Sequence, residues 1–171
     1  MHTATLHTPV CPKWHYGGNE MDDLYRELKP DVEAVAGPLL DMSEQLVCKH
    51  GHFLPHGAVL TESGETQLIM AAVEGLGERD VAPAEVLPLL HDALRATAAE
   101  KDHRATAVCE EVTITLEGQK PTAAIKVLVE HRRGLCVALY LPYRRKLLRG
   151  YDFGSVFVKP ADPEVRAWGD V

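Results

Sequence analysis

The sequence lacks any apolar run long enough to cross a membrane, because no window approaches about 18 uninterrupted apolar residues. Cysteine is sparse and dispersed, and no CxxC pair occurs. The four cysteines are Cys11, Cys48, Cys109 and Cys136. Their spacing is that of neither a disulfide scaffold nor a zinc finger, so we expect reduced thiols, some of them buried. The composition also excludes collagen, a coiled coil and a disordered tail.

The familiar catalytic and nucleotide-binding motifs are missing as well. The chain contains no GxSxG, HExxH, Walker loop or GxGxxG sequence. Cys109 and Cys136 fall within predicted strands, where a buried, inert thiol is the default. The sequence therefore indicates no catalytic residue, and an interaction protein is favoured over an enzyme.

What is present is one domain's worth of ordinary globular sequence. The chain has 171 residues, 46% of them hydrophobic and 25% charged, which is enough to bury a core without a disulfide or a metal. Residues 1–20 lack the basic start and apolar run of a secretory signal. We therefore expect a cytoplasmic protein with no membrane contact.

Hydrophobic periodicity predicts helices and strands in alternation along the chain. Spacings of three and four predict helices over 20–28, 31–49 and 83–100. Pro30 is expected to end the first, and Gly37-Pro38 to kink or split the second. Alternating patterns predict strands over 58–61, 66–72, 105–116, 122–130 and 135–141, with a last short strand over 154–159. Pro142 is expected to stop the strongest of these strands.

These elements predict an α+β fold in the order α-β-β-α-β-β-β. Short turns between neighbouring strands predict one antiparallel sheet of about five strands, with the helices packed on one face. We divide the chain into an irregular N-terminal segment at 1–19, a single α+β domain at 20–160 and a C-terminal tail at 161–171. The order of elements resembles that of profilin-like and roadblock-like domains.

Three short motifs resemble a diffuse group of small, uncharacterised bacterial proteins. The first is GHFLPHGAVLTESGE, in which the matching residues are Gly51, Phe53, Pro55, Gly57, Ala58 and Val59. The second is Glu130-His131 followed by Gly134, and the third is Leu141-Pro142-Tyr143. Together they span about residues 38–158. The resemblance implies a compact α+β module and no known chemistry.

A metal site is the sharpest chemical hypothesis. Four residues with zinc-binding side chains lie close together in the sequence, namely Cys48, His50, His52 and His56. Zinc is held by four nitrogen or sulfur ligands in a tetrahedron. The alternative is a solvated connection whose histidines bind nothing. If these residues bind zinc, we expect a zinc-dependent enzyme centred on the segment from His50 to His56. If they do not, we expect no cofactor.

Charge is distributed unevenly, and this favours an interaction surface. The net charge is −7, yet residues 119–159 hold 9 basic residues against 2 acidic ones. The candidate contact residues are Arg132, Arg133, Tyr143, Arg144, Arg145, Lys146 and Arg149. Arginine and tyrosine in this mixture suit an acidic protein partner, whereas so acidic a chain is not expected to bind nucleic acid. A solvated turn is the alternative reading.

The sequence therefore predicts a non-enzymatic interaction module, either a small bacterial adaptor or an immunity-type protein that blocks a partner. It would act through the basic surface and through an exposed sheet edge. Because sheet edges pair readily, a homodimer is expected as well.

Overall fold

The computed structural model describes residues 19–71, 81–100 and 102–169, which form two helices and seven strands. The helices are α1 (Asn19–His50) and α2 (Pro83–Glu100). The strands are β1 (His56–Thr61), β2 (Thr66–Ile69), β3 (His103–Ile114), β4 (Thr122–His131), β5 (Cys136–Arg145), β6 (Tyr151–Phe153) and β7 (Phe157–Pro160). The N-terminal segment 1–18 and the connection at 72–80 lie outside the described residues.

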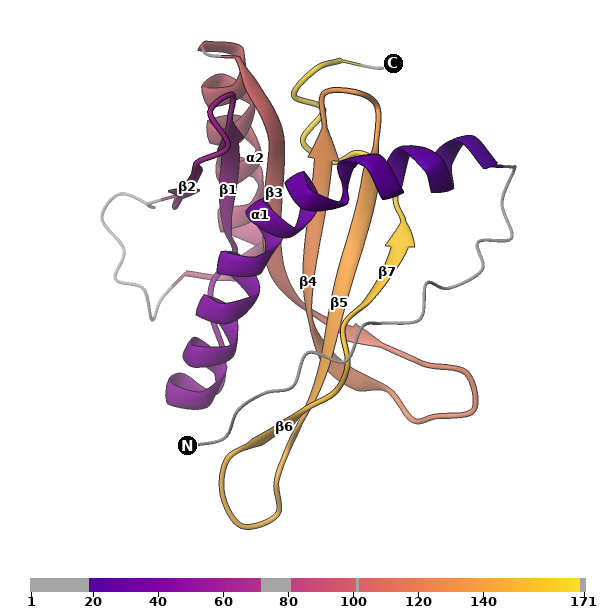
Figure 1. Ribbon diagram of the computed structural model, residues 1–171. Coiled ribbons are helices and arrows are strands. Elements are labelled where there is room, and N and C mark those ends of the chain that lie inside the picture. Colours follow the sequence, from indigo (N-terminus) through magenta and orange to yellow (C-terminus); the bar gives the residue numbers. More distant parts are fainter. Residues whose placement is uncertain (1–18, 72–80, 101, 170–171) are drawn as a thin grey trace.

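The strands form a single antiparallel sheet in the order β2-β1-β3-β4-β5-β6, with β7 pairing along β5 (Figure 1). The predicted α+β class and the single antiparallel sheet are therefore confirmed. The strand count differs, because the segment after β5 supplies both β6 and β7. Strands β3 and β4 pair over ten residues and make the centre of the sheet.

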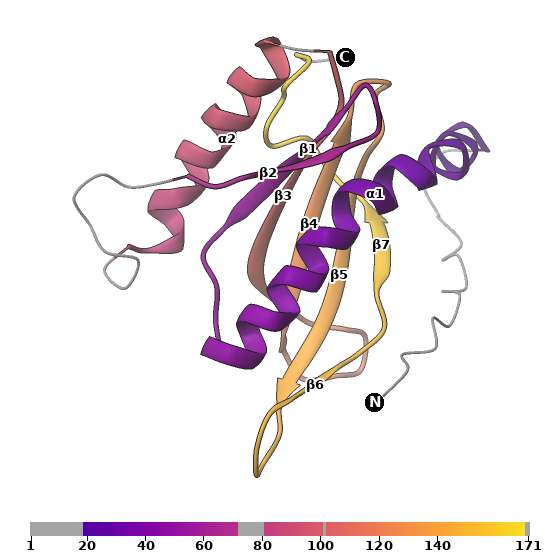
Figure 2. The ribbon, with the colours of Figure 1, turned by 60° about the vertical axis from the view of Figure 1, so that its left-hand side comes forward.

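The two helices pack on opposite faces of the sheet, so the prediction that both cover one face is wrong. Helix α1 packs over a core that includes Leu60, Ala107 and Val127. Helix α2 packs against Val59 and Val108, the immediate sequence neighbours of two of those residues. Successive residues of a strand point to opposite faces, so the sheet lies between the helices (Figure 2).

Helix α1 runs unbroken through Pro30 and Pro38, so the expected end at Pro30 is wrong. Of the two outcomes expected at Gly37-Pro38, a kink or a split, the split does not occur. A proline inside a helix leaves the carbonyl four residues earlier without its donor. For Pro38 that carbonyl belongs to Ala34, and the Thr66 hydroxyl of β2 donates to it at 2.7 Å. For Pro30 it belongs to Arg26, an exposed residue. The helix bends along its length (Figure 1).

Strand β5 continues past Pro142 to Arg145, so the prediction that Pro142 stops it is also wrong. The Pro142 carbonyl accepts a hydrogen bond from the Gly154 N–H at 2.8 Å, so Pro142 turns its backbone groups toward the β6 and β7 side. On that side β7 pairs as far as Tyr140, and β6 begins to pair at Tyr143. Pro142 lies in the gap between the two ladders, where no neighbouring strand would accept a hydrogen bond from its backbone nitrogen, so the missing N–H carries no cost.

Helix α2 has the bounds that the sequence predicts, and its start shows why. Pro83 stands in the first turn, where its missing donor does no harm. The Glu85 carboxylate accepts a hydrogen bond from the Ala82 N–H at 2.9 Å, which satisfies a donor at the helix N-terminus. Val86, Leu90, Leu94 and Ala98 form the buried stripe.

Candidate functional site

The four proposed zinc ligands do not gather into one site. Cys48, His50 and His52 are exposed at the end of α1 and just beyond it, whereas His56 is buried at the start of β1. Both ring nitrogens of His56 already have protein partners, the Leu54 carbonyl at 2.9 Å and the Ser43 hydroxyl at 3.2 Å. Across residues 19–71, 81–100 and 102–169 no three metal-ligating side chains cluster.

His56 belongs instead to a polar network beneath α1 that the sequence does not reveal. The Ser43 hydroxyl lies between His56 Nε2 and the Cys109 sulfur, 3.1 Å from the latter. All three side chains are buried. Burial lowers the pKa of His56 and raises the pKa of the Cys109 thiol to about 12, so both groups are held neutral. A serine next to a histidine suggests a nucleophile, but complete burial leaves a substrate no access.

The predicted basic surface divides into two groups at opposite ends of β5. Arg132 and Arg133 lie in the turn before β5, whereas Arg144 and Arg145 end that strand. Ten residues of strand span roughly 33 Å. The first group is already paired, because Arg132 contacts Glu62 at 2.7 Å and Arg133 Nη2 contacts Glu27 Oε2 at 3.1 Å. These two arginines join the β4–β5 turn to neighbouring parts of the fold.

Tyr143 is a core residue, although it was predicted to lie at the contact surface. Its side chain is buried and packs against Tyr151 and Phe153 of β6, with ring centroids 5.9 and 5.6 Å away. Burial, together with the Glu111 carboxylate, raises the pKa of its hydroxyl. This aromatic cluster holds β6 against β5 at the base of the hairpin that follows.

The remaining basic residues lie on that hairpin, which extends beyond the body of the protein (Figures 1 and 2). We call residues 144–150 the hairpin tip. Its basic side chains are Arg144, Arg145, Lys146 and Arg149, all exposed. At its apex lie Leu147 and Leu148, whose relative exposures of 105% and 100% are the highest among the large hydrophobic residues in the described part of the chain.

The hairpin tip has a closed, regular backbone. The Lys146 N–H donates to the Gly150 carbonyl at 2.9 Å, and Gly150 takes a positive φ of 85° that closes the turn. Lys146 contacts Asp152 at 3.0 Å. Within the described ranges, Arg144, Arg145 and Arg149 form no ion pair. The tip therefore presents two adjacent leucines and unneutralised positive charge.

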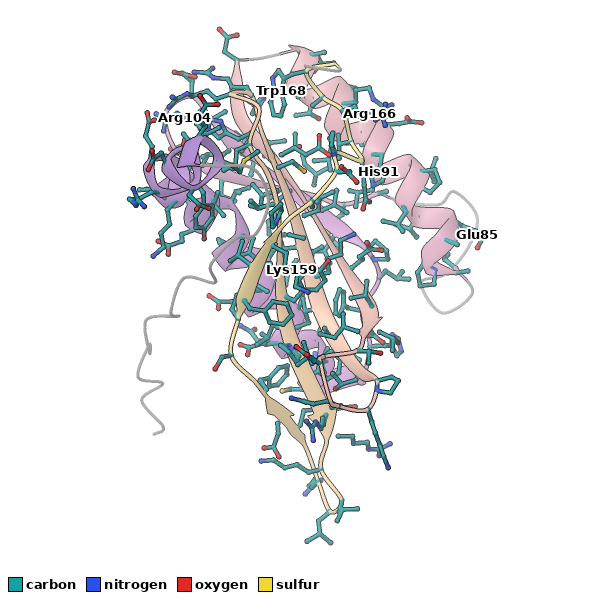
Figure 3. All side chains as sticks on the ribbon, turned by 90° about the vertical axis from the view of Figure 1, so that its right-hand side faces the viewer. Glu85, His91, Arg104, Lys159, Arg166 and Trp168 are labelled. Carbon is teal, nitrogen blue, oxygen red and sulfur yellow. The ribbon has the colours of Figure 1, made fainter. Side chains whose placement is uncertain are left out.

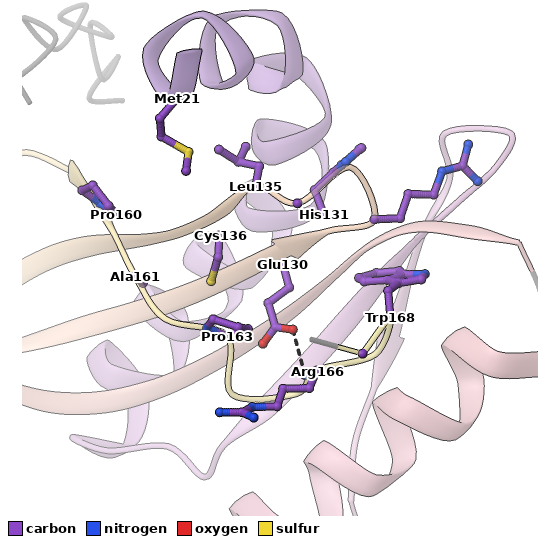
Figure 4. Close-up of a pocket in the computed structure, with 13 residues that line it drawn as sticks. Met21, Glu130, His131, Leu135, Cys136, Pro160, Ala161, Pro163, Arg166 and Trp168 are labelled. Atoms are coloured by element: carbon purple, nitrogen blue, oxygen red, sulfur yellow. Dashed lines mark hydrogen bonds between the residues drawn. The ribbon is translucent and has the colours of Figure 1, made fainter. Parts of the chain in front are cut away.

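A pocket with a cavity volume of about 200 Å³ lies at the opposite end of the molecule, beside the β4–β5 turn (Figures 3 and 4). Met21, Leu135, Pro160, Pro163 and Trp168 give it an apolar lining. Burial and nearby carboxylates, Glu130 first among them, raise the pKa of the Cys136 thiol in its wall to about 12. A thiol that stays protonated is a poor nucleophile.

The Glu130 and His131 side chains of this pocket are already bonded to the protein. The Glu130 carboxylate accepts hydrogen bonds from the backbone N–H groups of Glu164, Val165 and Arg166 at 2.7, 2.6 and 2.9 Å. His131 Nδ1 accepts the Arg133 N–H at 3.2 Å, so Nε2 donates to Asp31, also at 3.2 Å. These bonds fix the segment after β7 and the β4–β5 turn, and they leave neither group directed at a ligand.

The segment after β7 also packs between the sheet and α2. Val165 is buried, and its carbonyl accepts a hydrogen bond from Arg95 of α2 at 3.0 Å. Glu164 contacts Lys126 of β4 at 2.8 Å and lies 3.9 Å from His91 of α2. Figure 3 shows His91, Arg166 and Trp168 together at the end of the molecule away from the hairpin tip.

No family model, curated protein or solved structure matches this chain. In the described part, neither helix is both long and apolar enough to pass through a bilayer. The geometry favours the hairpin tip as the candidate site, because exposed apolar and charged groups coincide there.

Proposed function

We propose that the protein is a non-enzymatic interaction module of the adaptor kind, and that the hairpin tip is its principal contact surface. The observation that carries this proposal is the full exposure of Leu147 and Leu148 between basic side chains. Soluble proteins seldom leave adjacent large apolar side chains in water unless they meet a partner. The chemically versatile groups elsewhere, His56, Cys109 and Cys136, are buried or held neutral.

The charge of the tip selects its partner. Four cations flank two leucines, and Asp152 contacts only one of those cations. A complementary partner offers negative charge around an apolar site. The rest of the molecule is acidic, since the net charge is −7 despite this basic hairpin. An acidic partner therefore attracts the tip and repels the body, which orients the approach.

Photo-crosslinking in living cells tests whether the tip is a contact surface. A photoreactive amino acid replaces Leu148 in one variant and Ala96, on the exposed face of α2, in the control. We expect adducts from position 148 and few from position 96. The double substitution Arg144→Glu with Arg145→Glu should abolish them. Equal labelling from both positions, or none from position 148, contradicts the proposal.

We propose that a protein partner, a second copy of the chain included, pairs with the sheet edge at β2. Within the described residues, β2 pairs only with β1 and is the outermost strand on its side. Leu68 and Met70 along this edge are 50% and 69% exposed. An outer strand with exposed apolar side chains is a template for strand addition.

Native mass spectrometry tests the homodimer directly. We expect a dimer that Leu68→Lys combined with Met70→Lys converts to a monomer, because charge on an edge strand opposes pairing. A wild-type protein that is monomeric at every concentration contradicts the homodimer, and a different protein is then the only partner left for this edge.

A cytoplasmic location remains a prediction, and cell fractionation tests it.

A further inference from the structure

The hairpin tip also indicates what kind of partner it contacts, and this inference rests on its being the contact surface. We infer that the tip inserts into the surface of an anionic lipid bilayer, with Leu147 and Leu148 below the level of the headgroups and the basic side chains among the phosphates. The protein would then be bound peripherally by one hairpin, contrary to the expectation from the sequence that it makes no membrane contact.

The shape of the tip favours a bilayer over a protein. Leu147 and Leu148 stand at the convex end of a two-stranded hairpin, and both are fully exposed. A protein partner for such a tip needs a complementary concave surface, whereas lipid closes around a small convex apolar tip without a preformed pocket.

The order of residues along the tip matches the layers of a membrane surface. The leucines occupy the apex, and Lys146 and Arg149 flank them directly. Arg145 and Arg144 follow one and two residues further back on β5. Long basic side chains lie along apolar surface and extend their charge to the headgroups. Apolar groups at the apex and cations immediately behind them are the arrangement by which peripheral proteins hold anionic bilayers.

The base of the hairpin holds the tip in this conformation before it meets a membrane, so the tip does not have to fold on contact. Tyr143 is buried, and its ring packs against Tyr151 and Phe153 across the β5–β6 ladder. The Lys146–Gly150 hydrogen bond closes the turn above it. Since the tip is ordered in advance, insertion carries little cost in conformational entropy.

Vesicle co-sedimentation with the full chain tests the inference. The probes are vesicles of phosphatidylcholine alone and of phosphatidylcholine with about one-third phosphatidylglycerol. We expect binding to the anionic vesicles only. Leu147→Ser with Leu148→Ser should weaken the partition constant at least about tenfold. Arg144→Glu with Arg145→Glu should weaken it at least about 25-fold, since each cation near an anionic surface strengthens binding about fivefold.

The matched control is Arg132→Glu with Arg133→Glu, which makes the same change in charge at the other end of β5. Each variant is first checked for a native circular dichroism spectrum. We expect the control to keep most of the binding. A Leu148→Trp variant adds emission that should shift to shorter wavelength on anionic vesicles, because the new indole leaves water.

Three results overturn the inference: no binding to anionic vesicles, equal binding to both kinds of vesicle, or equal losses in the tip and control variants. Binding without a wavelength shift at position 148 overturns insertion as well. If vesicles fail while crosslinking from position 148 captures an acidic protein, the lipid inference falls and the contact surface stands. If both fail, the proposed function falls too.

Discussion

The carboxylate of Glu130 on β4 holds the backbone of Val165, with Oε1 2.6 Å from the Val165 nitrogen. The same carboxylate accepts the N–H groups of Glu164 and Arg166. Three consecutive backbone N–H groups, 34 to 36 residues further along the chain, thus donate to one buried carboxylate. Val165 is thereby placed in the core between the sheet and α2.

Replacing Glu130 with alanine should destabilise the fold strongly. The substitution leaves three N–H groups without an acceptor, and an unsatisfied buried group costs about 1–3 kcal/mol. Water will reach some of these groups, so we expect a loss of about 2–4 kcal/mol in the free energy of unfolding, measured by urea titration. Glu117→Ala, an exposed loop substitution, should change it by less than about 0.5 kcal/mol. Equal stability of the two variants would show that the segment after β7 is not held by this carboxylate.

Ser43→Ala should also be destabilising, because the hydroxyl bridges His56 and Cys109 in the core. Its removal leaves a buried imidazole nitrogen without a partner, and we expect a loss of about 1–3 kcal/mol in unfolding free energy. Ser63→Ala, in the exposed β1–β2 turn, is the control and should have little effect. A Ser43→Ala variant with wild-type stability would mean that the network contributes nothing to the fold.

Stability should fall as the pH is lowered from about 7.5 to about 5.5. Burial lowers the pKa values of His56 and His131 below the ordinary value of 6.5. The unfolded chain then binds more protons than the folded protein, so stability is fully present above the ordinary value and is lost below it. Glu44 acts in the opposite direction, because burial and Asp41 raise the pKa of its carboxyl group.

Melting temperatures measured across this range in a Glu44→Gln background test the prediction. His56→Asn should lower the melting temperature at neutral pH and reduce its dependence on pH. His52→Asn, at an exposed position, should leave that dependence in place. A melting temperature that rises as the pH falls would show that His56 and His131 are not held neutral.

The thiols should react in the order of their exposure. Cys48 is exposed, whereas burial raises the pKa values of Cys109 and Cys136 to about 12. In a Cys11→Ser variant, iodoacetamide at neutral pH should modify Cys48 first and Cys109 only after unfolding. Peptide mass spectrometry follows the sites, and denatured protein is the control in which all three react. Rapid modification of the folded protein at Cys109 would contradict the packing of α1 on β3.

Local sequence predicted those elements whose signals are local. Helix α2 begins at Pro83 and ends at Glu100 as expected, because a proline start and a regular apolar stripe define it. The β1–β2 turn at Glu62–Glu65 also lies as predicted, since Gly64 takes the positive φ of 86° that such a turn needs. The antiparallel order of the long strands followed from the short turns between them.

The errors come from tertiary contacts that no local pattern contains. Pro38 remains inside α1 because Thr66, far along the chain, donates to the carbonyl that the proline leaves free. Pro142 remains inside β5 because the ladder beside it changes from β7 to β6 at that point. The prediction that both helices share a face failed because the sequence indicates which stripe of a helix is buried, but not against which side of the sheet.

The candidate site was predictable in part. The basic residues at 144–149 were identified from charge alone, and the structure gives them a shared position on one hairpin. The sequence did not show that Arg132 and Arg133 lie far from that group. Pro142 indicated too early an end to β5, so the distance between the two ends of the strand could not be predicted. The adjacent leucines at 147 and 148 were visible in the sequence, but their importance depends on their exposure. His56 was grouped with its sequence neighbours, although the structure turns it inward to Ser43.

The hydrogen bonds between the Glu130 carboxylate and the backbone of residues 164–166 limit which substitutions this protein can accept. The three donors are main-chain groups, so any residue except proline at positions 164 and 166 supplies them. Only position 165 must remain apolar, because its side chain is buried. In related sequences we therefore expect position 130 to stay acidic and position 165 to stay apolar, while positions 164 and 166 vary. An alignment of related sequences would then show one invariant residue whose hydrogen-bond partners differ from sequence to sequence.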